Sequence, residues 1–417
     1  MLPDKLYQKI QIRQATNSLR ELPSSHNGID FSSNDYLGAV NHPALARVLQ
    51  TATRKILKEV SQGTSGATGS RLLTGNYPLY DTLEETVSRF HESESALIFN
   101  SGYTANLGFF QSVPQRGDVI LYDEYSHASI RDGIKMSDAK AYKFTHNSLN
   151  HLSQLLMKHS NYSLPLGEMP TGQRGLLGDK QKEDVRKQIQ EVYVVTESVF
   201  SMDGDSPDFV AITQLCATYG ARLIVDEAHA MGVLGTKGQG LVQLYGLSES
   251  VFARIVTFGK AAGSHGAAVL GSNALKQYLI NFARSFIYTT ALPPHTVASI
   301  LAFYQMLEAM ETSHMVENVR RLKKNINIFK SHIPRTGMDN YFISSVSAIQ
   351  CAIIPGVDRV KALSRKLKDK GYDLKPILSP TVPEGSERLR FCIHSYNTKE
   401  QLHEVLELLQ TELGGHD

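Results

Sequence analysis

Residues 222–232 read RLIVDEAHAMG, and residues 255–263 read IVTFGKAAG. In each segment a short apolar run rich in β-branched residues stops at small or charged residues, which is typical of a buried strand in a parallel sheet. Ligands of such sheets bind beyond the carboxyl ends of the strands. Asp226, His229 and Lys260 come at those ends. A carboxylate, an imidazole and an amine at one sheet edge indicate a cofactor site.

Lys260 and its neighbours suit an aldehyde cofactor such as pyridoxal phosphate. A neutral lysine amine forms a Schiff base with an aldehyde, and a desolvated setting helps to keep the amine neutral. The pyridine ring needs an acidic partner, which Asp226 supplies. His229 can hydrogen-bond the phenolic oxygen, and Thr257 can reach the phosphate. Taken alone, Lys260 could equally be a surface lysine after a strand, but the three other residues argue against that interpretation.

Composition describes an ordinary globular chain. Its 417 residues suffice for two or three domains, with 41% hydrophobic and 20% charged residues. The net charge of +2 argues against nucleic acid or an anionic membrane as a partner. Cys216, Cys351 and Cys392 are widely spaced in apolar surroundings, which favours reduced thiols over disulfides or a metal site. With no apolar N-terminal segment of signal-peptide length, we expect a soluble cytoplasmic protein without a metal.

Strands and helices alternate through the middle of the chain. Strands are expected at residues 96–99, 119–122, 192–196, 223–226, 255–258 and 266–271, and helices at 79–91, 209–219, 275–286 and 295–311. This alternation predicts an α/β domain with a mainly parallel sheet over residues 56–300. A polar, Pro- and Gly-rich stretch from Lys158 to Gln190 is expected to be a surface insert of that domain.

The two ends of the chain differ from its middle. Residues 1–55 are expected to form an N-terminal arm, in which residues 2–22 have the spacing of an amphipathic surface helix. Residues 301–417 are expected to form a smaller α+β domain. Its strands would be residues 347–354 and 389–393 of a half-exposed sheet, and its closing helix residues 399–413.

Two further strand ends carry candidate ligands. Ser101, Gly102 and Tyr103 begin a helix whose free N–H groups and positive dipole end suit a phosphate, although capping alone would explain Ser101. His127 could stack on an aromatic cofactor or be structural. The glycine-rich loop at residues 63–71 matches neither GxGxxG nor a Walker pattern, which disfavours a dinucleotide-binding dehydrogenase.

Candidate ligands for a substrate carboxylate lie near both ends of the chain. Asn34 is either an Asx-turn residue or a ligand, and Arg20 on the arm is a candidate anion ligand. Arg388 and Arg390 flank Leu389 and point the same way from a strand. Such a pair is either a solvated face or a bidentate carboxylate site.

Together these residues resemble the α-oxoamine synthases, a branch of fold-type I pyridoxal-phosphate enzymes, from Phe31 to Ile393. The matching segments, in order, are FSSNDYLG (31–38), FNSGYTAN (99–106), SHAS (126–129), ESVFSMDGD (197–205), VDEAHAMG (225–232), VTFGK (256–260) and PTVPEGSERLR (380–390). The resemblance implies an α/β fold with a seven-stranded, mainly parallel sheet and a smaller C-terminal α+β domain. FSSNDYLG and GSRLLTGN (69–76) are most similar to the member that joins L-alanine to a pimeloyl thioester in biotin biosynthesis.

The resemblance also implies roles for single residues. Lys260 would hold pyridoxal 5'-phosphate as a Schiff base and transfer a proton, Asp226 would pair with the pyridine nitrogen, and His127 would stack on the ring. The other expected cofactor ligands are Gly102, Tyr103, Glu197, Ser201, His229 and Thr257, with Thr289 or Thr290 reaching the partner subunit's phosphate in a homodimer. The expected substrate ligands are Arg20, Asn34, His127, Thr381 and Arg390.

The implied reaction is a decarboxylative condensation of L-alanine with pimeloyl-CoA or pimeloyl-acyl carrier protein. It yields an amino ketone, CO2 and the free thiol carrier. Two alternatives within the family use glycine with acetyl- or succinyl-CoA, or serine with a long acyl-CoA. A non-catalytic partner subunit is a third alternative, which the presence of Lys260 argues against.

The chain departs from the family pattern at four places. Ala261 and Ala262 follow the lysine where glycine is usual, and Tyr80 replaces the histidine of an HxxLE run. Leu378 and Ser379 precede Pro-Thr-Val-Pro where an arginine is frequent, which bears on the acyl donor. The fourth departure is the insert at residues 158–190, which has no counterpart in compact members.

Overall fold

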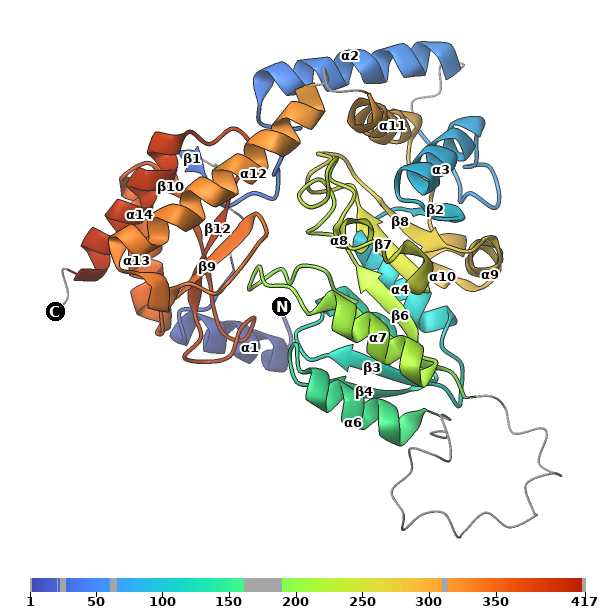
Figure 1. The fold of residues 1–417 in the computed structure, drawn as a ribbon, viewed down its shortest axis with the longest axis horizontal. Coiled ribbons are helices and arrows are strands. Elements are labelled where there is room, and N and C mark those ends of the chain that lie inside the picture. The colour runs from blue at the N-terminus through green and yellow to red at the C-terminus, as the bar shows by residue number, and fades with distance from the viewer. Residues whose placement is uncertain are drawn as a thin grey trace, which may run out of the picture.

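The computed structural model describes residues 2–20, 22, 28–60, 66–160, 190–309 and 314–414. Its larger sheet has seven strands in the order β2-β8-β7-β6-β5-β3-β4 (Figure 1). They are β2 (Ser95–Phe99), β3 (Val119–Asp123), β4 (Lys140–Phe144), β5 (Val192–Glu197), β6 (Arg222–Asp226), β7 (Ala253–Thr257) and β8 (Ala267–Gly271). Strand β8 runs opposite to the other six strands. The expected mainly parallel α/β sheet is confirmed.

Helices cover both faces of this sheet because its strands are apolar on both sides. Ile120, Ile224 and Ile255 pack against one layer of helices, and their neighbours Leu121 and Val225 pack against the other. The first layer is α4 (Gly102–Ser112), α5 (Ala128–Lys135), α9 (Asn273–Phe282) and α10 (Arg284–Ile287). The second is α3 (Pro78–Phe90), α6 (Leu149–His159), α7 (Phe209–Tyr219) and α11 (Pro294–Glu308), with α8 (Leu241–Leu244) beside it.

A smaller antiparallel sheet has the order β11-β12-β9. It comprises β9 (Ile349–Ile353), β11 (Lys375–Ile377) and β12 (Arg388–Cys392), next to α12 (His314–His332), α13 (Val357–Asp369) and α14 (Lys399–Gly414) (Figure 1). The half-exposed sheet predicted here is wrong for β12, which is buried at every position. Leu389 and Phe391 belong to the hydrophobic core, while Arg390 on the opposite side bonds to the loop after β5 and to the N-terminal segment.

The N-terminal segment joins the smaller sheet. After α1 (Asp4–Ala15), which has no buried residue, β1 (Ile29–Asp30) pairs in parallel with β10 (Tyr372–Asp373). The backbone N–H of Cys392 then donates to the carbonyl of Phe31 at 2.8 Å. Next, α2 (Pro43–Val60) packs on α11 and crosses residue 56, where the arm was predicted to end. The domain limits stay a prediction.

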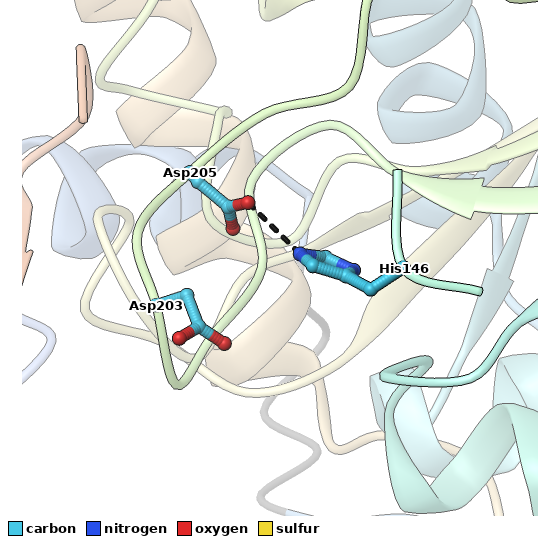
Figure 2. Close-up of side chains that lie close together, drawn as sticks. All are labelled: His146, Asp203 and Asp205. Atoms are coloured by element: carbon cyan, nitrogen blue, oxygen red, sulfur yellow. Dashed lines mark hydrogen bonds and ion pairs between the residues drawn. The ribbon is translucent and has the colours of Figure 1, made fainter. Parts of the chain in front are cut away.

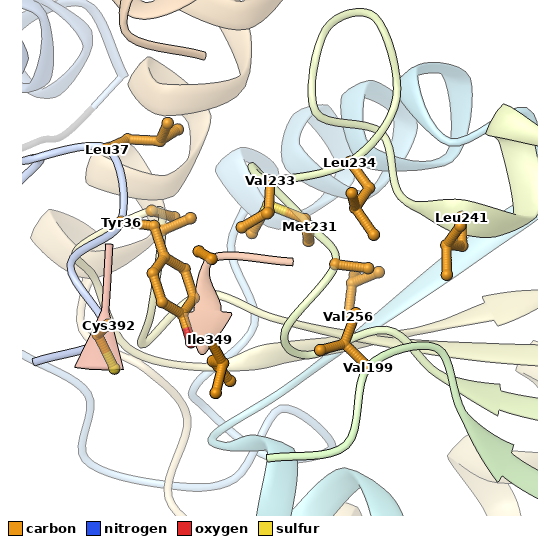
Figure 3. Packing of buried hydrophobic residues seen from close by; sticks show 14 of the residues in the cluster. Tyr36, Leu37, Val199, Met231, Val233, Leu234, Leu241, Val256, Ile349 and Cys392 are labelled. Carbon is orange, nitrogen blue, oxygen red and sulfur yellow. The ribbon is translucent and has the colours of Figure 1, made fainter. Parts of the chain in front are cut away.

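One hydrophobic core joins these parts. Figure 3 shows Tyr36 and Leu37 of the N-terminal segment. They lie together with Met231 from the loop after β6, with Val256 of the larger sheet and with Ile349 of the smaller sheet. The shared core fixes the position of the smaller sheet against the carboxyl ends of the larger one. Among the helices of the described ranges, none has the length and hydropathy needed to cross a bilayer.

One expected helix differs in the structure, and parts of two expected segments cannot be compared with it. The helix expected at residues 275–286 is divided at Ala283 into α9 and α10. Residues 161–189 of the expected insert and residues 63–65 of the glycine-rich loop lie outside the described residues.

Candidate active site

A pocket lies where β2, β5, β6 and β7 end. Because β8 is antiparallel to both β2 and β7, all four of these strands end at the same edge of the sheet. The predicted site residues that line the pocket are Asn34, Gly102, Tyr103, His127, Glu197, Asp226, His229, Thr257 and Lys260. Other lining residues include Ser101, Asn106, Ser129, Gly259 and His265. The sequence therefore located the pocket but not all of its wall.

Asp226 is held rigidly at the end of β6. Its Oδ1 accepts a hydrogen bond from the backbone N–H of Ala228 at 2.9 Å, and its Oδ2 accepts one from the Asn106 amide at 2.8 Å. Asn106 lies inside α4 and was not among the predicted site residues. Asp226 is 5% exposed, so these two donors fix the direction of a buried carboxylate.

Lys260 follows β7 in a tight turn that Gly263 closes by donating to the Lys260 carbonyl at 2.9 Å. Burial lowers the pKa of Lys260 below its ordinary value of 10.5. The carboxylates of Asp226 and Glu197 oppose that shift, and the guanidinium of Arg390 adds to it. A lowered pKa increases the fraction of neutral amine, which is the nucleophilic and basic form.

His229 is a buried, neutral imidazole. Burial holds its pKa well below the ordinary 6.5, and the positive charges of Lys260 and Arg390 act in the same direction. Its Nδ1 is hydrogen-bonded to the hydroxyl of Tyr36 at 2.7 Å, which leaves Nε2 for the pocket. Tyr36 also donates to Oδ1 of Asn34 at 3.1 Å. Tyr36 was not predicted, although it lies within FSSNDYLG.

His127 caps α5 and is tied to its surroundings by backbone and ring. Its N–H donates to Oε1 of Glu197 at 2.6 Å, and its Nδ1 bonds to Ser129 Oγ at 2.8 Å. Burial lowers the pKa of His127, opposed by Asp226 and reinforced by Lys260. Burial raises the pKa of Glu197 well above its usual range, and the charge of Asp226 adds to this.

The N-terminus of α4 and the end of β7 form a cradle for an anion. Ser101 and Thr104 make a capping box, so the helix begins abruptly at Gly102. A Cβ on Gly102 would lie 2.5 Å from Thr257 Cγ2, which is why only glycine fits. Thr257 Oγ1 is buried and has no hydrogen-bond partner among the described residues. Free amides, a helix dipole and an unpaired hydroxyl match a phosphate.

Arg390 lies beside the pocket and bonds to one of its walls. Its Nη2 donates to Asn34 Oδ1 at 3.0 Å, and its Nε donates to the carbonyl of Ser201 at 2.8 Å. Arg388 pairs with the carboxylate of Asp203. Both arginines are buried, so the solvated-face interpretation is wrong. Arg390 and Asn34 together offer donors for a carboxylate.

Besides Arg390, five predicted residues do not line this pocket. Ser201 contributes its carbonyl to Arg390 outside it, and Thr381 lines a neighbouring pocket. The Asn100 amide donates to Thr289 Oγ1 at 3.2 Å and to the Thr290 carbonyl at 2.6 Å. Arg20 is exposed.

A group of potential metal ligands in and beside the loop after β5 is an ion-pair network. His146, Asp203 and Asp205 lie close together, as Figure 2 shows. Both ring nitrogens of His146 are bonded to carboxylates at 2.9 Å, Nδ1 to Asp123 and Nε2 to Asp205. Burial lowers the pKa of His146, but these two hydrogen bonds outweigh burial and raise it to about 9. The ring is therefore a cation at neutral pH.

The chain matches one family model, and it is similar to curated proteins and solved structures over nearly its whole length. The family model of aminotransferase class I and II matches residues 26–409. The 8-amino-7-oxononanoate synthase of Emericella nidulans is 38% identical over 99% of this chain and 96% of its own length. Among solved structures, the serine palmitoyltransferase of Sphingomonas wittichii has a TM-score of 0.81 at 26% identity, covering 99% of this chain and 97% of its own. The 8-amino-7-oxononanoate synthase of Francisella tularensis has a TM-score of 0.69 at 28% identity, covering 93% and 98%.

Proposed function

Since the chain belongs to the class I and II aminotransferase family, and within it to the α-oxoamine synthases, we propose that it condenses L-alanine with a pimeloyl thioester. The products are 8-amino-7-oxononanoate, CO2 and the free thiol carrier, in biotin biosynthesis. The observation that carries the proposal is the convergence of Lys260, Asp226 and His229 in a pocket beside the Asn34–Arg390 pair. The Emericella nidulans relative, matched over nearly its full length, supports this choice of reaction.

The residues of the pocket fit pyridoxal 5'-phosphate. The Gly102 cradle and the unpaired hydroxyl of Thr257 suit its phosphate, and the fixed carboxylate of Asp226 suits its pyridine nitrogen. His229 offers a ring nitrogen to the phenolic oxygen, and His127 offers a ring that can stack on the cofactor. When bound through Lys260, the cofactor supplies an electron sink for negative charge at the α-carbon of the amino acid.

The chain's own groups carry out the remaining tasks. Arg390 and Asn34 bind the α-carboxylate of L-alanine and orient its α-C–H bond. The neutral amine of Lys260 takes the α-proton and later returns a proton to the same carbon. Asp226, fixed by Asn106, would bind the pyridine nitrogen of the cofactor. Glu197 holds the backbone of His127, and thereby the His127 ring, in place.

We also propose a homodimer in which Thr289 or Thr290 reaches the phosphate of the partner subunit. Both residues accept a hydrogen bond from the side-chain amide of Asn100. Asn100 follows β2 and comes one residue before the capping box of α4. A cytoplasmic location is supported by Cys216, Cys351 and Cys392, which are buried free thiols.

A spectral titration tests the proposed amino acid. The cofactor-loaded protein is titrated with L-alanine, glycine and L-serine, and pimeloyl-CoA is then added with product detection by mass spectrometry. The largest response to L-alanine, followed by 8-amino-7-oxononanoate, is expected. The second candidate is a serine palmitoyltransferase-like activity, which the similarity to the Sphingomonas wittichii structure supports. A preference for L-serine would favour it. A folded Lys260→Ala variant should form no 8-amino-7-oxononanoate, because it lacks the amine that moves the α-proton.

A further inference from the structure

A second pocket lies beside the cofactor pocket. Its walls come from the segment that leads into α5, from the loop after β5 and from the segment before β12. The lining residues are Glu124, Tyr125, Arg131, Phe200, Met202, Asp203, Ser379, Pro380, Thr381, Val382, Pro383 and Arg388.

Two shared elements connect the pockets. His127 and Arg131 are one helical turn apart, which puts their Cα atoms about 6 Å apart along the axis of α5. Arg390 and Arg388 are alternate residues of β12, about 7 Å apart on one face. In both cases the first residue belongs to the cofactor site and the second lines the neighbouring pocket. The two pockets therefore lie next to each other along α5 and β12.

Most charges in this pocket are already engaged. Arg388 is buried against the carboxylate of Asp203 and also donates from Nε to the Ser386 carbonyl at 2.9 Å. Glu124 accepts the backbone N–H of His146 at 3.0 Å. Arg131 is different, because it is exposed and has no ion-pair partner in the described part of the chain.

The rest of the pocket suits a hydrocarbon chain. Phe200, Met202, Val382 and the prolines supply apolar surface to the pocket that Arg131 also lines. The ring of Tyr125 stacks on His146 with ring centres 4.3 Å apart and planes 23° apart, and His146 is itself held between Asp123 and Asp205. This wall is therefore rigid.

We propose that Arg131 binds the distal carboxylate of the acyl donor and so selects a dicarboxylic acyl chain over a monocarboxylic one. The inference rests on the proposed function, since it concerns the second substrate of the same reaction. A chain with an apolar middle and a terminal anion matches a pocket with apolar walls and one uncommitted cation. The hydroxyls of Thr381 and Tyr125 are further donors to that carboxylate.

An anionic carrier is the other source of negative charge near Arg131. The phosphates of coenzyme A would also attract an exposed guanidinium. The two sources differ in one respect: a contact with the acyl carboxylate depends on the acyl chain and not on the carrier.

Calorimetric binding to the cofactor-loaded protein, without amino acid, separates these cases. The ligands are pimeloyl-CoA and heptanoyl-CoA, which differ in the distal carboxylate, and their N-acetylcysteamine thioesters, which lack phosphates. The variants are Arg131→Met and, as a matched control, Lys135→Met. Lys135 lies one turn further along α5, is 76% exposed and does not line the pocket.

Arg131→Met is expected to weaken pimeloyl-CoA binding about ten- to a hundredfold, the usual range for a charged hydrogen-bonded contact, and to leave heptanoyl-CoA unchanged. The same difference should appear with the N-acetylcysteamine thioesters, and Lys135→Met should change neither. Equal weakening of both CoA thioesters would assign Arg131 to the carrier and overturn the inference, as would no weakening at all. Failure of the proposed function is distinguishable, because it appears as absence of 8-amino-7-oxononanoate formation by the unaltered enzyme.

Discussion

The side-chain amide of Asn106, inside helix α4, donates a 2.8 Å hydrogen bond to the carboxylate of Asp226 at the end of β6. The two residues are 120 positions apart in the chain, and both are buried. The contact couples the helix that begins at Gly102 to the carboxylate at the end of β6. One helix would therefore position both ends of the cofactor proposed for this pocket.

Replacing Asn106 with leucine should loosen the cofactor without unfolding the protein. The change removes a buried donor and leaves Asp226 Oδ2 without its partner, at a cost of about 1–3 kcal/mol. We expect the dissociation constant for pyridoxal phosphate, measured by equilibrium dialysis, to rise about tenfold. Asn318→Leu is the control, because Asn318 is also a buried helical amide that donates to a carbonyl, at 2.9 Å, and does not line the pocket. Equal weakening by both variants would contradict the coupling.

The anion cradle formed by the N-terminus of α4 and the end of β7 leads to a separate prediction. Gly102→Ala places a methyl group 2.5 Å from Thr257 Cγ2, so that α4 and β7 must separate. Affinity for pyridoxal phosphate should fall at least about tenfold, roughly 1.4 kcal/mol, while affinity for pyridoxal, which lacks the phosphate, should change little. Gly66→Ala is the matched control, since a methyl group there meets nothing within 4 Å. Equal losses for pyridoxal and pyridoxal phosphate would exclude a phosphate-specific effect.

The pocket could be predicted because its residues follow apolar runs. Asp226, Glu197 and Thr257 each end a buried strand, and the rules of parallel sheets put strand ends together. Asn106 was missed because a polar residue inside a helix reveals its partner only once the helix packs on the sheet. Tyr36 was missed for the same reason, since its partner His229 is 193 positions away.

Tertiary packing explains the other differences between the prediction and the structure. The burial of Arg388 and Arg390 depends on loops from the larger sheet that cover β12, which no local pattern encodes. Strand β4 was not predicted, because it is an edge strand whose residues Lys140, Ala141 and Lys143 are exposed and provide no apolar run. Edge strands carry this weaker signal in general.

His146 should make stability depend on pH. Its folded pKa of about 9 lies above the ordinary 6.5, so its stabilisation is fully present below pH 6.5 and is lost as the pH rises through 9. We expect His146→Gln to lower the free energy of unfolding by about 2 kcal/mol at pH 6, a figure reduced for the partial exposure of the ring, and by little at pH 10. Urea unfolding at both pH values measures this. A pH-independent difference would mean that the ring is not charged.

Arg390 should recognise the carboxylate of the amino acid rather than its amine. Arg390→Lys keeps the positive charge but removes the fork that bonds Asn34 and the Ser201 carbonyl, so the bidentate geometry is lost. The dissociation constant for L-alanine, read from the absorbance of the bound cofactor, should rise about tenfold or more. Ethylamine has the same amine and no carboxylate, so its binding should be unchanged. Parallel weakening of both ligands would show that the substitution acts on the pocket as a whole, because only a carboxylate contact separates the two.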